Sequence, residues 1–158
     1  ILTMYIMNPV TQETYEILRD EWDTIDAKDL ATVEAVLAKA KEPIKKFLLK
    51  HANERERQFF HESAKELWPP ERSENLKDDD LMVLAPAFTV SELTEAFQIG
   101  FLIYLPFIVI DLIVSNILLS MGMMMVSPMT ISLPFKLLLF VVVNGWARLI
   151  HSLLLTYV

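Results

Sequence analysis

The order of apolar and polar residues divides the chain into two halves of different character. Between residue 27 and about residue 67, apolar positions recur every three or four residues among charged ones. One such stripe runs from Val33 to Ala40 and a second from Ile44 to His51. This spacing places each stripe on one face of a helix, with the charges on the other faces. The pattern predicts two amphipathic helices, either solvated or packed by one stripe on a neighbouring subunit.

Prolines mark the helix boundaries that we expect in this half. Residues 1–7 are mostly apolar, and Asn8-Pro9 has the form of a helix N-cap followed by Pro at the first helical position. We therefore expect residues 1–8 to be the end of an upstream hydrophobic helix, with a polar helix beginning at Pro9. Because proline cannot continue a helix without losing a hydrogen bond, we expect Pro43 to begin the second amphipathic helix. The run from Trp68 to Asp80 predicts an exposed connector.

The second half is long and apolar. The pattern Thr89-Val90-Ser91-Glu92 matches a capping box and predicts a helix start near Thr89. From Ile99 to Val126 the ionisable side chains are Tyr104 and Asp111 alone. This segment is about 40 Å long if it is helical throughout, which exceeds the hydrocarbon core of about 30 Å. It therefore has the length and composition of a membrane helix.

Three positions predict interruptions in this half. We expect Pro106 to kink or break the first apolar helix, because a proline frees a backbone carbonyl. Gly122 and Pro128 then mark a break before a second apolar run, residues 131–158. The half is predicted to be a helical hairpin of membrane-protein character.

The charges follow the same division. Of the 35 charged residues, 30 lie in residues 1–80 and five in residues 81–158. We predict an all-α protein in three parts: residues 1–8, a polar helical region and connector at 9–80, and an apolar hairpin at 81–158. The net charge of −7 and the lack of a basic stripe disfavour nucleic acid as a partner.

Few residues suit enzymatic chemistry. The chain has no Cys, which excludes disulfides, thiolate metal sites and a Cys nucleophile. Its three Gly are too scattered for a phosphate-binding loop, and its three His are too far apart to suggest a metal pair. We predict no metal site and no cofactor.

The methionines near the predicted turn are the first candidate site. Met123, Met124 and Met125 follow Gly122, and consecutive helical positions lie about 100° apart, so a helix could not point all three the same way. Beside Gly122 and Pro128 the backbone can leave the helix and project them together. Methionine is flexible and polarizable and fills irregular space. The three side chains are either a soft plug, which several copies would extend to a collar, or ordinary lipid-facing or core residues.

Charged groups in the apolar half are the second candidate. An ionised Asp111 at hydrocarbon depth would cost about 3 kcal/mol or more, so it should face protein or water. There it either makes a hydrogen bond between helices or takes part in proton handling. Glu92 and Lys136 lie at the edges of the apolar segments, and pairing would offset their desolvation. Alternatively, Glu92 serves only the capping box and Lys136 extends to the membrane interface.

Several motifs occur in a distinctive order across residues 81–157. They are Pro86-Ala87-Phe88, Ser91-Glu92-Leu93, Pro106-Phe107, Asp111-Leu112, Gly122-Met123-Met124-Met125, Pro134-Phe135-Lys136 and Gly145-Trp146. This half resembles the FliP/SctR family, the core export-gate proteins of bacterial type III secretion systems, and residues 1–80 resemble it more weakly. The run Ser127–Ser132 is more similar to the virulence injectisome branch than to the flagellar one. One departure is Asn144, where the family often has Asp.

The resemblance implies an assembly. Family members form a closed helical export channel from five copies, together with FliQ/SctS-type and FliR/SctT-type partners. Met123, Met124 and Met125 would match the family's methionine gasket, and Glu92 and Lys136 would match charged residues that link subunits. The hairpins would pack within a core complex of the bacterial inner membrane that is lifted largely out of the bilayer plane and reaches into the periplasm. Membrane lipid would be a further partner, and residues 9–80 would lie on the periplasmic side.

Three functions compete at this point. The leading hypothesis is a non-enzymatic channel subunit that passes unfolded secreted proteins and seals the pore with methionines. The second is a proton-coupled transporter subunit with Asp111 as the titrating group. The third is an intramembrane hydrolase that uses Asp111, which is weakest because neither apolar run holds a second carboxylate.

Overall fold

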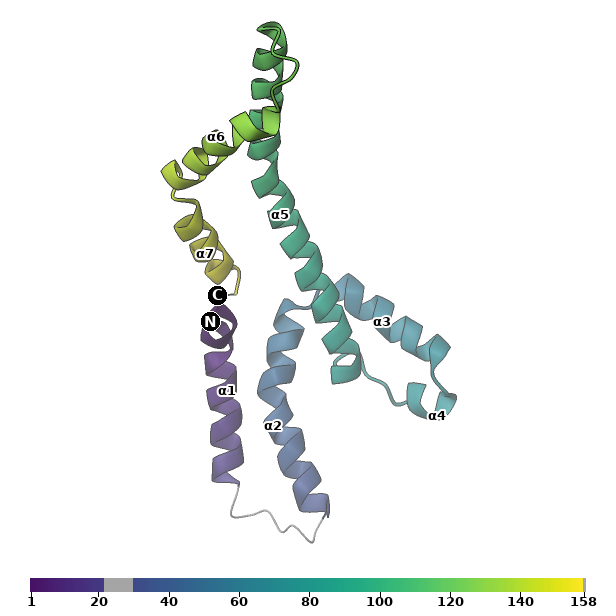
Figure 1. Ribbon diagram of the computed structural model, residues 1–158. Coiled ribbons are helices and arrows are strands. Elements are labelled where there is room, and N and C mark those ends of the chain that lie inside the picture. The colour runs from purple at the N-terminus through teal and green to yellow at the C-terminus, as the bar shows by residue number, and fades with distance from the viewer. Residues whose placement is uncertain (22–29, 158) are drawn as a thin grey trace. The chain divides into compact units, whose positions relative to one another are not determined.

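The protein is built from helices. The computed structural model describes residues 1–21 and 30–157, and over these ranges it contains no strand. The elements in order are α1 (Leu2–Asp20), α2 (Leu30–His51), α3 (Glu54–Leu67), α4 (Pro70–Ser73), α5 (Leu81–Ser120), α6 (Pro128–Val142) and α7 (Gly145–Thr156) (Figure 1). The prediction of an all-α fold is confirmed.

The chain forms two compact units that divide within α5. The first unit comprises Ile1–Thr94 and the second Glu95–Val158. The change of composition at residue 80 coincides with the start of α5 at Leu81. The first turns of the apolar helix thus belong to the compact unit of the charged half.

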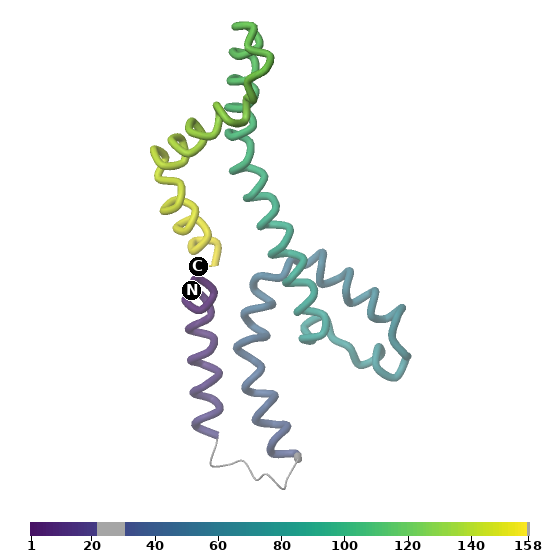
Figure 2. The backbone as a smooth tube through the Cα atoms, viewed as in Figure 1, coloured from purple at the N-terminus to yellow at the C-terminus, as the bar shows by residue number. Residues whose placement is uncertain are grey.

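In the first unit, α1 and α2 lie side by side in opposite directions (Figure 2). Among the described residues, the buried apolar side chains come from α2, α3, the start of α5 and the residue between α2 and α3: Val36, Ala40, Pro43, Ala52, Ala64, Val83, Leu84 and Ala87. The Asn53 side chain caps α3 by accepting a hydrogen bond from the Arg55 backbone N–H at 3.0 Å. The Asn53 backbone N–H donates to Ser91 Oγ at 2.9 Å, so the start of α3 is attached directly to α5.

Two predicted helix starts in this unit are wrong. Pro9 lies inside α1, and Pro43 lies inside α2. A proline removes one hydrogen bond from a helix. The packing of α1 against α2 keeps both helices continuous across that loss.

The predicted helix start at Thr89 is also wrong. α5 begins at Leu81, and the Thr89 hydroxyl donates to the Ala85 carbonyl at 2.8 Å, as hydroxyls inside helices do. The preceding residues are apolar, and Val83 and Leu84 are buried. Their burial favours helix upstream of the capping pattern, and the pattern then has no free N–H groups to cap.

The second unit is a hairpin made of the remainder of α5, followed by α6 and α7. α5 is helical at Pro106 and on to Ser120, so the helix does not end at Pro106, and a kink there stays a prediction. The second apolar run does not form one helix, because α6 and α7 meet at an angle of 55°. Asn144 lies between them in the left-handed conformation, with φ 55°, which Asn tolerates better than most residues.

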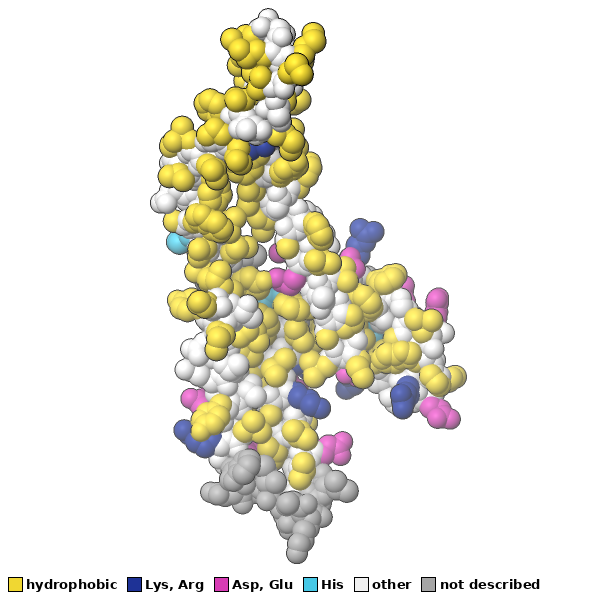
Figure 3. All heavy atoms as spheres, in the orientation of Figure 1, with side chains coloured by type: hydrophobic (Ala, Val, Ile, Leu, Met, Phe, Trp, Pro, Cys, Tyr) yellow, Lys and Arg dark blue, Asp and Glu magenta, His cyan; other side chains and the backbone are white. Residues whose placement is uncertain are grey.

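The second unit leaves most of its apolar side chains uncovered. α5 is long and apolar enough to cross a membrane, and α6 with α7 would count as a second span if the bent pair acts as one. Hydrophobic side chains cover the visible face of α6 and α7, whereas charged side chains gather over α1 to α4 (Figure 3). The buried residues of this unit, in the part that the structure describes, are Val114, Leu118 and Ser132.

Candidate functional site

The first part of the candidate site is the methionine turn, residues Met121–Ser127. α5 ends there in a Schellman motif: Gly122 has φ +74°, the Met123 N–H donates to the Leu118 carbonyl, and the Gly122 N–H donates to the Leu119 carbonyl. Only glycine adopts this φ without steric cost. Pro128 follows the turn at the first position of α6, where its missing N–H costs nothing.

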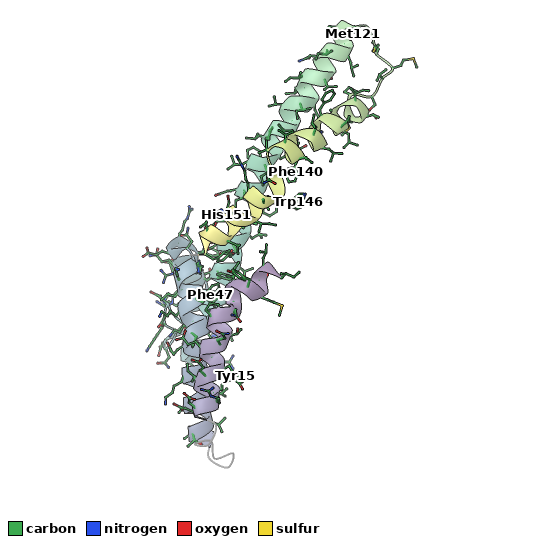
Figure 4. The ribbon with its side chains drawn as sticks, turned by 90° about the vertical axis from the view of Figure 1, so that its left-hand side faces the viewer. Tyr15, Phe47, Met121, Phe140, Trp146 and His151 are labelled. Carbon is green, nitrogen blue, oxygen red and sulfur yellow. The ribbon has the colours of Figure 1, made fainter. Side chains whose placement is uncertain are left out.

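The methionines of this turn are exposed. Met123 is 45% exposed, Met124 83% and Met125 101%, and none of them is in a helix. Figure 4 shows Met121 at the end of α5, where the chain turns back. Because the backbone here is irregular, the 100° separation of consecutive helical residues does not apply. The methionine side chains therefore extend freely from the end of the hairpin.

The second part is a charge network between the two arms of the hairpin. Lys136 Nζ in α6 donates to Asp111 Oδ2 in α5 at 2.6 Å, and the Ser132 hydroxyl donates to Asp111 Oδ1 at 2.5 Å. Ser132 is fully buried, while the side chains of Lys136 and Asp111 are 21% and 31% exposed. Both carboxylate oxygens thus have a donor, as a charged group in apolar surroundings requires.

The position of this network follows from the lengths of the arms. Asp111 lies nine residues before the end of α5 at Ser120, and Lys136 lies eight residues after the start of α6 at Pro128. At 1.5 Å per residue, both lie about 13 Å from the turn. The turn therefore brings the two charges to the same level.

Sequence reasoning missed this partner of Lys136. It paired Lys136 with Glu92, which belongs to the first compact unit, whereas Lys136 belongs to the second. The available signal was that Asp111 and Lys136 are the only charged residues from Ile99 to Val143 and lie equally far from the turn. For Asp111, the structure has the hydrogen bond between helices that was one of its two predicted roles.

The network lies between two open apolar grooves of the hairpin. One of about 440 Å³ is bordered by Ile103, Phe107, Phe140 and Leu149, and one of about 360 Å³ by residues such as Ile110 and Phe135. The arms do contact each other through Phe107 and Phe140, whose ring centroids lie 6.5 Å apart. The arms are therefore connected by both aromatic and polar contacts.

A close approach holds the bend between α6 and α7. Phe140 stacks edge-on against Trp146, with ring centroids 5.4 Å apart. A Cβ atom on Gly145 would lie 2.5 Å from Phe140 Cε2, so any other residue would require the ring to move. The Gly145-Trp146 motif thus has a packing role at the bend.

Comparison with known proteins gives consistent matches over almost the whole chain. A sequence model described as the FliP family matches residues 1–153. "Yop proteins translocation protein R" of Yersinia pestis is 54% identical over 157 residues, which cover 99% of this chain and 71% of that protein. "Hypersensitivity response secretion protein HrcR" of Ralstonia nicotianae is 48% identical, with 99% and 72% covered. "Virulence protein YscR" of Salmonella typhimurium is 46% identical, with 96% and 71% covered.

Proposed function

The chain belongs to the FliP family, and we propose that several copies of it form the channel through which unfolded secreted proteins pass. As a member of this family, it is a component of a type III secretion export apparatus of the injectisome type and not an enzyme. Proteins of this apparatus are membrane-associated. Beyond this family membership, the proposal adds that the copies enclose a pore and that methionine side chains close it.

The exposed methionine turn is the observation that carries this proposal. Met123, Met124 and Met125 extend from the end of an apolar hairpin, where Met123 is partly covered by its own chain and Met124 and Met125 are almost uncovered. Unbranched thioether side chains adapt to irregular and changing surfaces. Around a shared axis, the turns of five copies would form a gasket that blocks ions and yields to a passing chain.

The uncovered apolar surface of the second unit supports an assembled state. Side chains such as Phe97, Phe101 and Leu137 are exposed in the single chain. Large exposed apolar patches are typical of surfaces that contact another protein or lipid. We propose that further copies, FliQ/SctS-type and FliR/SctT-type partners and lipid of the bacterial inner membrane cover them. The charged residues 9–80 would then lie on the periplasmic side.

The gasket is tested by electrical leakage. We replace Met123, Met124 and Met125 together by Ala in the assembled complex and, as the matched control, together by Leu, which keeps the apolar bulk. We expect the Ala variant to leak ions across a lipid bilayer and the Leu variant to stay closed. A tight Ala variant in an intact complex would overturn the gasket.

The proposal keeps Glu92 and Lys136 as a link between neighbouring subunits. Lys136 already pairs with Asp111 in its own chain, so Glu92 of a neighbour would extend this network. Because the chain has no Cys, a pair of engineered cysteines can be joined selectively by a thiol-reactive bismaleimide, whose length matches a pair of long charged side chains. With the bismaleimide, we expect Glu92→Cys with Lys136→Cys to cross-link neighbouring subunits, and Asp111→Cys with Lys136→Cys to cross-link within a chain. A monomeric product from the first pair would contradict the link.

A second candidate function, proton-coupled transport by Asp111, has one specific observation in its favour. Asp111 is a carboxylate within an apolar arm. Its two carboxylate oxygens accept hydrogen bonds from Ser132 and Lys136, which favours a structural role instead. Asp111→Asn should abolish export under either role. The exchange Asp111→Lys with Lys136→Asp should restore export only if the pair is structural.

A further inference from the structure

Sulfur is concentrated at the end of the hairpin. Five of the eight methionines lie within nine residues: Met121, Met123, Met124, Met125 and Met129. All five are exposed. No charged residue occurs between Asp111 and Lys136, and the chain has no Cys. The end of the hairpin therefore presents thioethers as its main metal-binding donors.

Thioethers select a particular class of metal ion. Soft sulfur ligands favour soft cations such as Cu(I), whereas carboxylate and carbonyl oxygens favour Mg²⁺, Ca²⁺ and Mn²⁺. Within the described residues, no group of three or more His, Asp or Glu side chains could hold a metal ion. We infer that the methionine turn, together with Met129, is a binding site for a soft monovalent cation, Cu(I), held by at least three thioethers.

The backbone of the turn allows the sulfurs to converge. In a helix, consecutive methionines would diverge by about 100° per residue. Met123, Met124 and Met125 instead follow the left-handed Gly122 and lie outside any helix, while Met121 and Met129 flank them at the two helix ends. Each side chain has three rotatable bonds, and Met124 and Met125 are 83% and 101% exposed, so these two have little packing to lose on reorientation. A cation can therefore gather several sulfurs without distorting α5 or α6.

The donor set predicts an unusual pH dependence. Cys, His and carboxylate ligands must lose a proton before they bind a metal, so their affinity falls in acid. A thioether carries no such proton. Binding at the methionine turn should therefore keep its affinity as the pH is lowered from 7.5 to 5.

This inference is independent of the proposed channel, because it needs only the turn of a single chain. Substitution by Leu separates the two: Leu keeps the apolar bulk that a gasket needs and removes the sulfur that a metal needs. A closed pore with no metal binding in the Leu variant would support both proposals. If the unaltered protein does not bind the metal, only the metal site is contradicted. If its pore is not closed, only the gasket is contradicted.

The test uses the full chain in detergent micelles, with Ag(I) as an air-stable probe of the Cu(I) site. With ¹³C-labelled methionine methyl groups, we expect Ag(I) to shift the signals of the turn methionines saturably and to leave those of Met4, Met7 and Met82 in place. Replacing Met123, Met124 and Met125 together by Leu should weaken binding at least about tenfold. The matched control replaces Met4, Met7 and Met82 by Leu and should bind as the unaltered protein does.

Two outcomes would overturn the inference. One is unchanged Ag(I) affinity in the turn variant, and the other is a loss of affinity between pH 7.5 and 5. Oxidation gives an independent measurement: hydrogen peroxide transfers one oxygen atom to each thioether, forming a sulfoxide and water. Bound Ag(I) should protect the turn methionines from this reaction, and the oxygen additions can be counted for each peptide by mass spectrometry.

Discussion

The two compact units place their apolar and charged groups in opposite ways. In the first unit, Val83 and Leu84 are almost completely buried, and the ion pair between Lys45 and Asp79 lies at the surface. In the second unit, most large apolar side chains are exposed, and the pair of Asp111 with Lys136 lies between the two arms. The first unit buries its own apolar surface, whereas the second depends on its surroundings to do so.

This difference shows which forces hold each unit together. In water, burial of apolar surface drives association of helices. In apolar surroundings that drive is absent, and packing and hydrogen bonds hold helices together instead. The hydrogen bonds from Lys136 and Ser132 to Asp111 have this role between the arms. The first unit therefore relies on a buried apolar core, whereas the second adds a polar network to a smaller number of apolar contacts.

The largest expected effect is the loss of a core side chain in the first unit. Leu84 is completely buried, so Leu84→Ala should lower the free energy of unfolding by about 3 kcal/mol. Urea unfolding in detergent, followed by circular dichroism, measures this change. Leu112, which is 59% exposed in α5, is the matched control. Leu112→Ala should change the stability of the single chain by less than about 0.5 kcal/mol. Equal losses of unfolding free energy in the two variants would contradict the difference in burial between the two units.

A smaller effect is expected at the bend of the second unit. Gly145→Ala places a methyl group against the Phe140 ring, which is itself stacked on Trp146. We expect a net loss of about 1 kcal/mol in thermal unfolding, because the clash exceeds the gain in helix propensity. Phe140→Leu in the same chain should recover part of this loss. A stabilised Gly145→Ala variant would show that the ring moves away freely.

The smallest effect is expected at the surface ion pair of the first unit. The hydrogen bond from Lys45 lowers the pKa of Asp79 and raises that of Lys45. The pair therefore stabilises the fold above the unfolded pKa of Asp, about 4, and this stabilisation is lost as the pH falls through the lower folded value. Asp79→Asn should cost less than about 1 kcal/mol at pH 7, because the pair is exposed.

The pH dependence provides the control for this ion pair. The stability difference between Asp79→Asn and the unaltered protein should disappear near pH 2 and shrink in 1 M salt. At the alkaline end, the contribution of Lys45 should persist until the pH passes its raised pKa. A difference that is constant from pH 7 to pH 2 would show that Asp79 acts through packing and not through charge.

Local sequence patterns predicted the helices well but placed their ends poorly. Apolar periodicity indicated helical structure up to about residue 67, and Gly122 with Pro128 marked the turn between α5 and α6, but the two stripes assigned to separate helices both lie in α2. Pro9, Pro43 and Thr89 were taken as helix starts and lie inside helices. A cap or a proline changes helix stability by only a few kcal/mol. Burial of neighbouring apolar residues can exceed that amount, and a single sequence does not show which residues are buried.

For the candidate site too, the sequence predicted some features and missed others. The identity and spacing of Gly122 and the methionines were sufficient to predict a turn that leaves the helix. The contact of Lys136 with Asp111 was missed because it depends on how the two arms align. The bend at Asn144 was missed because the amino-acid composition does not determine the backbone angle φ of a single residue. Pairing of Glu92 with Lys136 stays a prediction between subunits.

The sequence by itself determined the all-helical class, the division into charged and apolar halves, and the methionines at the turn. These depend on residue type and on periodicity, which are local properties of the chain. Only the tertiary structure decided where the helices end, which charges meet and which apolar surfaces remain open. Those outcomes depend on contacts between residues far apart in sequence. Such a contact contributes to stability only when the fold has brought its two residues together.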